Sequence, residues 1–137
     1  MAELYTTDIL RWTTKIPHTA RLEGEGILHI TKTSRVCGSR INADALVEEG
    51  VITAYGQEVK ACALGQASAA IFGQHIMGLT ASEFAGIASR FRHMVKTGEA
   101  DFPEKWADLA LLAPVHDHPG RHGSVLLPVE VLEEAFK

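Results

Sequence analysis

Residues 36–71 read VCGSRINADALVEEGVITAYGQEVKACALGQASAAI and contain the only two cysteines of the chain, Cys37 and Cys62. Apolar and polar side chains alternate in residues 38–48, and residues 51–60 are rich in strand formers, so both runs are expected to be β-strands. Between them, a Glu-Glu-Gly turn places Gly50 where a positive φ is needed. A hairpin returns the chain to its starting end, so this pattern predicts both thiols at one end of a small sheet.

The flanking sequence predicts one further strand and several helices. β-formers indicate a strand at 26–33, and helical spacing indicates an N-terminal helix at 4–16 and an Ala-rich helix at 64–77. Thr80 and Glu83 have capping-box spacing, with bonds expected in both directions. We expect a helix to run from this cap to residue 97, followed by a short helix at 106–112 and a loop at 114–123. A terminal helix is expected at 125–136, with Ser124 as its N-cap and Pro128 near its first turn. The prediction is a single α+β domain over 1–137, with a three-stranded antiparallel meander.

Composition excludes several functional classes. The chain has 137 residues, 46% hydrophobic and 22% charged, as expected for one globular domain. A formal net charge of −4 argues against nucleic-acid binding, and no apolar run approaches the roughly 20 residues that span a membrane. Glu3 and Asp8 interrupt the N-terminal sequence, which therefore does not read as a signal peptide. We expect a cytoplasmic protein whose cysteines are thiols or ligands rather than a disulfide.

Three segments carry a recognisable pattern of cysteine, glycine and proline: SRVCGSRI at 34–41, VKACALGQASAAI at 59–71 and HPGRHGSVLLPVEVLEEAF at 118–136. They resemble the Cys-Gly-Asp turn, the strand–Cys–helix segment and the Pro-x-Arg-x-Lys-Cys-x-x-Leu-Pro-x-x-x-Leu segment of the iron–sulfur cluster assembly scaffolds of the NifU amino-terminal, IscU and SufU type. The last segment matches at Pro119, Arg121, Leu127, Pro128 and Leu132, which favours the SufU-like branch. The resemblance covers nearly the whole chain and implies the fold of that family.

The sequence departs from the family at its ligand positions. The family brings three cysteines and an aspartate together at the end of the sheet. Here Ser39 stands at the aspartate position, Ser124 at the third cysteine position, and Gly123 where the family has Lys or His. Serine hydroxyls stay protonated near neutral pH and are poor ligands for iron or zinc. Only Cys37 and Cys62 carry over as ligands.

Two thiols leave the ligand set of a [2Fe–2S] cluster incomplete, because such a cluster needs four ligands. Of the histidines at 116, 118 and 122, His122 is best placed, two residues before Ser124, and a mixed site of Cys37, Cys62 and His122 for iron or a cluster is one solution. A homodimer with two cysteines per chain is a second, and small-molecule thiols are a third. A structural zinc is disfavoured, since it requires a closed set of four ligands.

Two functions follow from the resemblance. The first is a scaffold or carrier that receives sulfur from a cysteine desulfurase and hands a cluster to apoproteins. The second is a persulfide acceptor or regulatory adaptor without stable cluster binding, with Cys62 as the possible acceptor because a helix N-terminus favours its thiolate. No acid/base pair, phosphate loop or nucleophile–base spacing suggests an enzyme of another class.

Overall fold

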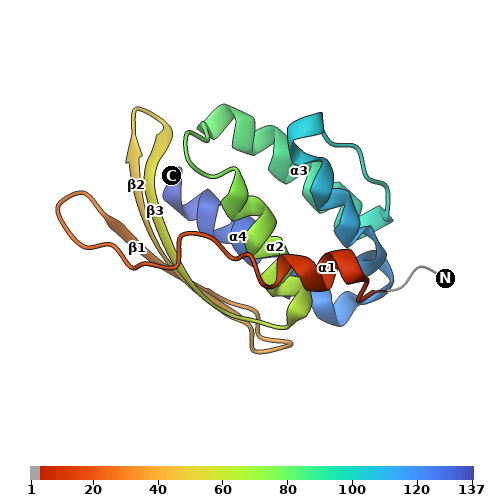
Figure 1. Cartoon of the computed structure of the whole chain (residues 1–137). Coiled ribbons are helices and arrows are strands. Elements are labelled where there is room, and N and C mark those ends of the chain that lie inside the picture. Colours follow the sequence, from red (N-terminus) through yellow and green to blue (C-terminus); the bar gives the residue numbers. More distant parts are fainter. Residues whose placement is uncertain (1–3) are drawn as a thin grey trace.

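The computed structural model describes residues 4–137 as a three-stranded sheet covered on one face by helices (Figure 1). Helices α2 and α4 contact the strands, while α3 packs outside them against η1 and α4. No helix in this range is long and apolar enough to cross a membrane. In chain order the elements are α1 (Thr7–Trp12), β1 (Leu28–Thr33), β2 (Arg40–Glu48), β3 (Val51–Lys60), α2 (Ala63–Gln74), α3 (Ala81–Thr97), η1 (Glu104–Asp117) and α4 (Pro119–Ala135).

The sheet has the predicted order β1-β2-β3, with both pairs antiparallel. Ile41, Ala43 and Ala45 face the helices and are at most 1% exposed, so the alternation seen in the sequence is the alternation of the two sheet faces. The β2–β3 turn consists of Glu49 and Gly50, both with positive φ, as two-residue hairpin loops require. The predicted meander and its Gly50 turn are confirmed.

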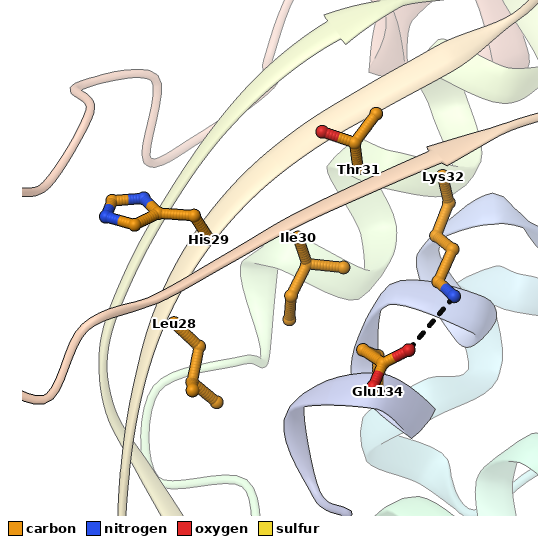
Figure 2. Close-up of a pocket in the computed structure, with 6 residues that line it drawn as sticks. All are labelled: Leu28, His29, Ile30, Thr31, Lys32 and Glu134. Atoms are coloured by element: carbon orange, nitrogen blue, oxygen red, sulfur yellow. Dashed lines mark hydrogen bonds and ion pairs between the residues drawn. The ribbon is translucent and has the colours of Figure 1, made fainter.

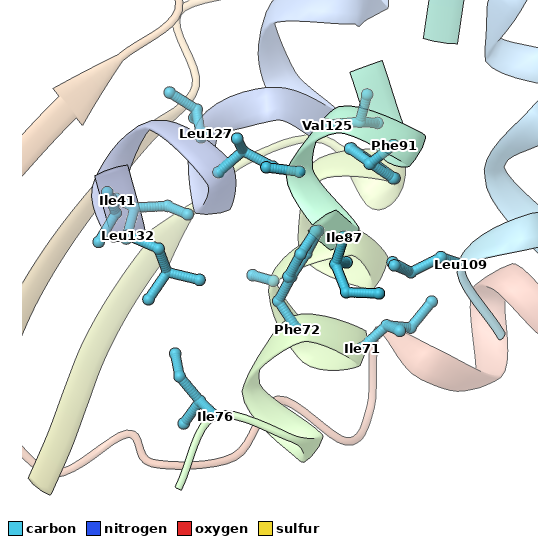
Figure 3. Packing of buried hydrophobic residues seen from close by; sticks show 14 of the residues in the cluster. Ile41, Ile71, Phe72, Ile76, Ile87, Phe91, Leu109, Val125, Leu127 and Leu132 are labelled. Atoms are coloured by element: carbon cyan, nitrogen blue, oxygen red, sulfur yellow. The ribbon is translucent and has the colours of Figure 1, made fainter. Parts of the chain in front are cut away.

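Helix α2 is the centre of the core. Its small side chains let neighbouring elements approach from several sides, and all of its residues except Ala63, Gln66 and Gln74 are buried. Phe72 packs edge-to-face on Phe91 of α3, with 5.2 Å between ring centroids (Figure 3). Its ring centroid also lies 5.8 Å from that of Trp106 in η1. The predicted helix at 64–77 is therefore present but ends earlier, at Gln74.

The ends of α1 and α3 follow from local hydrogen bonds. Thr6 caps α1 through Ile9 N–H, and the Thr13 and Thr14 hydroxyls donate back to carbonyls in its last turn, so this helix is shorter than the predicted 4–16. Thr80 caps α3 by accepting from Glu83 N–H at 3.0 Å, and Gly98 ends it with φ 83°. The reciprocal half of the predicted capping box is wrong, because the Glu83 carboxylate instead accepts from Trp106 Nε1 at 2.9 Å.

The C-terminal helix begins earlier than its sequence suggests. Residues 114–123 are not a loop: η1 continues to Asp117, and α4 begins at Pro119, where a proline at the first helical position loses no hydrogen bond. Pro128 therefore lies in the middle of the helix, where it lacks the N–H that would donate to the Ser124 carbonyl. The Ser68 hydroxyl of α2 donates to the next carbonyl, that of Val125, at 2.6 Å.

Two ion pairs tie β1 and the preceding segment to the rest of the fold. Lys32 Nζ lies 3.2 Å from Glu134 Oε1 of α4, beside a groove of about 270 Å³ along β1 that contains neither thiol (Figure 2). On the other sheet face, the fully buried Asp44 accepts from Arg21 Nε at 2.7 Å and Leu22 N–H at 2.9 Å, and lies 2.6 Å from His29 Nδ1. These contacts hold the connection between α1 and β1 against β2.

Candidate functional site

Both thiols lie at the same end of the sheet, as the hairpin predicts. Arg40 at the start of β2 pairs in register with Lys60 at the end of β3. Cys37 lies three residues before this pair, in the turn entering β2, and Cys62 lies two residues after it, as the N-cap residue of α2. Both cysteines are free and partly exposed.

Two buried serines connect the thiols. Cys37 Sγ lies 3.3 Å from Ser39 Oγ, the Ser124 hydroxyl donates to Ser39 Oγ at 3.0 Å, and Ser124 Oγ lies 3.4 Å from Cys62 Sγ. Ser39 is 3% exposed and Ser124 is 0% exposed, so neither hydroxyl is hydrated and each depends on these partners. The four positions that the resemblance predicts as ligand positions are therefore brought together here as a hydrogen-bonded row of two thiols and two hydroxyls.

Ser124 reaches this row because α4 passes very close to α2. The predicted role of Ser124 as N-cap is wrong, since α4 begins five residues earlier and Ser124 faces inward from its second turn. Gly65 of α2 makes the approach possible: a Cβ at that position would collide with Ser124 Oγ and lie 2.8 Å from Ala61 Cβ. Glycine at 65 therefore determines where the Ser124 hydroxyl can lie.

Gly65→Ala is expected to destabilise the protein by about 1–3 kcal/mol, the usual cost of overpacking a rigid core. Gly86→Ala is the matched control, because Gly86 also lies inside a helix but a Cβ there meets no atom within 4 Å. That control should gain up to about 1 kcal/mol from better helix propensity. Urea unfolding of both variants measures the difference, and equal effects would show that the α2–α4 approach is not tight.

The surroundings of Cys37 favour the thiolate form of its side chain. Burial raises the pKa of its thiol, but hydrogen bonds from the Ser34 and Ser39 hydroxyls and the Ser39 backbone N–H outweigh burial and lower the pKa to about 7. Ser34 Oγ lies 3.4 Å from the sulfur. A Cβ at residue 123 would lie 2.5 Å from Ser34 Oγ, so Gly123 leaves room for this hydroxyl. Sequence reasoning missed Ser34, although its place three residues before Cys37 in a turn was the available signal.

The histidines are held differently from the thiols. His122 Nε2 lies 2.8 Å from the Val115 carbonyl and 3.2 Å from the His116 carbonyl, so its ring is turned toward η1. His118 is exposed beside Cys37, and His116 Nε2 lies 3.7 Å from Asp117 Oδ1. Within residues 4–137 no three His, Cys, Asp or Glu side chains are gathered closely enough to hold a metal ion. The structure thus brings Cys37 and Cys62 together with two serines and leaves His122 outside that group.

A groove of about 500 Å³ opens beside Cys37. It runs between the turn before β2 and the junction of η1 with α4. The lining residues are Val36, Cys37, Asp117, His118, Pro119, Gly120 and Arg121. Val36 is 79% exposed, the most exposed large apolar side chain among those described. The Cys37 sulfur is therefore reachable from solvent through a groove of small-ligand size.

Comparison with known proteins places this geometry in a family. No protein-family model and no curated protein matches the chain. Among solved structures, the N-terminal part of a nitrogen-fixing NifU-like protein from Brucella abortus is 30% identical and superposes with a TM-score of 0.89, covering 96% of this chain and 90% of that one. A protein from Fervidobacterium islandicum AW-1, proposed as an iron–sulfur cluster assembly scaffold of the SUF system, is 22% identical with a TM-score of 0.83 and coverage of 98% and 97%.

A hypothetical protein solved at 2.3 Å resolution shares the same fold, with 22% identity, a TM-score of 0.80 and coverage of 94% and 93%. The match with the Brucella protein, at 30% identity, takes in nearly the whole of this chain. The chain belongs to the family of iron–sulfur cluster assembly scaffolds of the NifU amino-terminal, IscU and SufU type.

Proposed function

We propose that this protein assembles or carries an iron–sulfur cluster as cargo, with Cys37 and Cys62 as its ligands. The observation that carries the proposal is the meeting of the two thiols at one end of the sheet, joined through Ser39 and Ser124. Thiolates are the usual protein ligands of such clusters, and [2Fe–2S] is the cluster that we propose. Family membership supports the same function.

The chain offers half of a four-donor set. Cys37 and Cys62 supply thiolates, while the Ser39 and Ser124 hydroxyls stay protonated and are occupied by hydrogen bonds. His122 Nε2 is engaged with the two carbonyls of η1, and within residues 4–137 His122 forms no metal-binding group with the two thiols, so we propose the cysteines alone as protein ligands. The remaining donors come from outside this chain, and a closed four-ligand zinc site is not proposed.

We further propose a cysteine desulfurase as the sulfur donor and cluster-accepting apoproteins as the recipients. Sulfur transfer requires an accessible thiolate, which the exposed groove and the lowered pKa of Cys37 support. A second copy of the chain is one source of the outside donors, since two chains together carry four cysteines. The cytoplasm, a reducing compartment, would keep these thiols free.

Anaerobic reconstitution with iron, sulfide and a desulfurase tests the scaffold function. The wild-type protein should become coloured through sulfur-to-iron charge transfer. Cys37→Ala and Cys62→Ala should each lose that visible absorption, because one remaining thiol cannot hold the cargo. His93→Ala, on the surface of α3, is the control and should keep the colour. A wild-type protein that stays colourless at near-stoichiometric iron, both with and without an added low-molecular-mass thiol, would refute the proposed function.

The lowered pKa of Cys37 also favours a second candidate function, persulfide acceptance without a stable cluster. In that reaction the Cys37 thiolate attacks the outer sulfur of the desulfurase persulfide, the S–S bond breaks, and the desulfurase thiolate leaves. Intact-mass spectra after desulfurase treatment should show added sulfur in Cys62→Ala and none in Cys37→Ala. The opposite pattern would assign the acceptor role to Cys62, as the sequence alone suggests.

A further inference from the structure

The thiol end of the molecule has an unusual charge distribution. Among residues 4–137, most Lys and Arg side chains have an acidic partner within ion-pair distance: Arg11, Arg21, Lys32, Arg90, Arg92, Lys105 and Lys137. The other six have none in this range: Lys15, Arg35, Arg40, Lys60, Lys96 and Arg121. Four of these six, namely Arg35, Arg40, Lys60 and Arg121, belong to segments at the thiol end of the sheet. We call these four side chains the cationic rim. The chain as a whole has a net charge of −4, whereas these four side chains together are positively charged.

The fold places each member of the cationic rim. Arg35 lies in the turn that carries Cys37, Arg40 and Lys60 are register partners at the end of the hairpin, and Arg121 lines the groove. The first three are exposed. Two carboxylates lie nearby but have other contacts: Glu58 accepts from Asn42 Nδ2 at 3.0 Å, and Asp117 lies 3.7 Å from His116 Nε2. The rim therefore retains an excess of positive charge.

The groove and the cationic rim together favour one chemical class of ligand. About 500 Å³ is the size of a small-molecule site, and the groove reaches the partly exposed Cys37 thiol. Arg and Lys side chains bind carboxylates, and Arg does so through two parallel hydrogen bonds. The exposed Val36 adds an apolar surface for an aliphatic stem. A small anionic compound fits this combination better than a second copy of the chain, which would bring a second cationic rim against the first.

We propose that the groove beside Cys37 binds a low-molecular-mass thiol that carries carboxylates, and that two molecules of this thiol supply the two donors missing at Ser39 and Ser124. The inference rests on the proposed scaffold function for its second part only. The positive charge of the cationic rim attracts the carboxylates, Arg121 holds them in the groove that it lines, and the two thiol sulfurs are the donors that the hydroxyls cannot provide. Glutathione is the probe of this chemical class.

The recognition step is testable on the metal-free protein by disulfide exchange. In Cys62→Ser, Cys37 is the only thiol, and its thiolate attacks one sulfur of a disulfide reagent, forms a mixed disulfide and releases one thiolate. Oxidised glutathione carries carboxylates, whereas cystamine carries only amines. Each rate is divided by the rate of the same chain unfolded in urea, which removes intrinsic differences between the reagents. At low salt the folded protein should favour oxidised glutathione by about tenfold or more, through electrostatic attraction to the rim.

Charge-removing variants identify the side chains responsible. Arg121→Gln and Arg35→Gln should each reduce the preference, and the double variant should abolish it. Lys137→Gln makes the same change of charge at the other end of α4, roughly 24 Å along the helix axis, and should keep the preference. Equal normalised rates for the two reagents, or a preference that survives the double variant, would overturn the proposal.

The ligand step is tested by anaerobic reconstitution with iron and sulfide, followed by native mass spectrometry. With glutathione present, we expect a cluster on one chain with glutathione retained, and much less cluster with cysteamine, which lacks carboxylates. A cluster held between two chains whether or not glutathione is added would overturn the ligand claim but leave the scaffold function intact. No cluster under any condition would overturn both, so the two failures are distinguishable.

Discussion

Ser39→Asp combined with Ser124→Cys is expected to give the protein a tight zinc site. The two hydroxyls already lie between Cys37 and Cys62, in contact with both sulfurs and with each other. Converting them to a carboxylate and a thiolate would add one aspartate and one cysteine to Cys37 and Cys62, which completes a closed set of four donors of the types that zinc binds. Apparent zinc affinity should rise by several orders of magnitude, with protons released as the thiols bind.

Competition with a chromophoric zinc chelator measures this gain, and the increase in melting temperature on adding zinc provides a second readout. Ser68→Cys is the matched control, because Ser68 is also a buried serine of the α2–α4 interface but its hydroxyl donates to the Val125 carbonyl rather than to the thiol row. If the double variant binds zinc no better than this control, Ser39 and Ser124 do not occupy ligand positions.

Replacing Asp44 is expected to cause the largest loss of stability among single polar substitutions. Its carboxylate is 0% exposed and contacts Arg21, Leu22 N–H and His29. Asp44→Ala should lower the free energy of unfolding by about 3 kcal/mol, the low end of the range for breaking a buried pair, because the half-exposed Arg21 can return to water. Asp8→Ala, which removes an exposed pair with Arg11, should cost at most about 1 kcal/mol.

The same carboxylate gives stability a defined pH dependence. Hydrogen bonds from Arg21 are the main cause that lowers the pKa of Asp44 far below its usual range, against burial, which raises it. A depressed folded pKa stabilises the protein above the unfolded pKa of about 4, and that contribution is lost as the pH falls. Urea unfolding between pH 7 and pH 3 should show a shallower loss of stability in Asp44→Asn than in the wild type. Equal slopes would assign the acid sensitivity to other groups.

The hairpin could be predicted from the sequence because its determinants are local. Alternation at Ile41, Ala43 and Ala45 specifies which face is buried, and the Gly50 turn specifies the pairing. The meeting of Cys37 and Cys62 follows from that register. The presence of the helices could also be predicted from the sequence. The ends of α2 and α4 could not, because packing against distant elements determines where these two helices begin and end.

The rest of the site depends on contacts between residues far apart in the chain. Ser124 meets Ser39 across 85 positions, and only the absence of a side chain at Gly65 permits that approach. Residues 114–123 read as a loop because proline, glycine and histidine are common there, yet Pro119 begins a helix. Likewise, no periodicity in the sequence indicates that Ser34 contacts Cys37 or that Asp44 is buried against Arg21. Spacing in the sequence could not reveal these partners.

The bond between Ser124 and Ser39 has a consequence for how folding relates to cargo. It joins α4 to the residue that precedes β2, between the two thiols. Because the hydroxyls satisfy one another, this connection needs no metal ion. A bound cluster would still add to the stability of the folded state, but its release would not break the contact between these two segments. A protein built this way could give up a cluster and keep its shape for the next one.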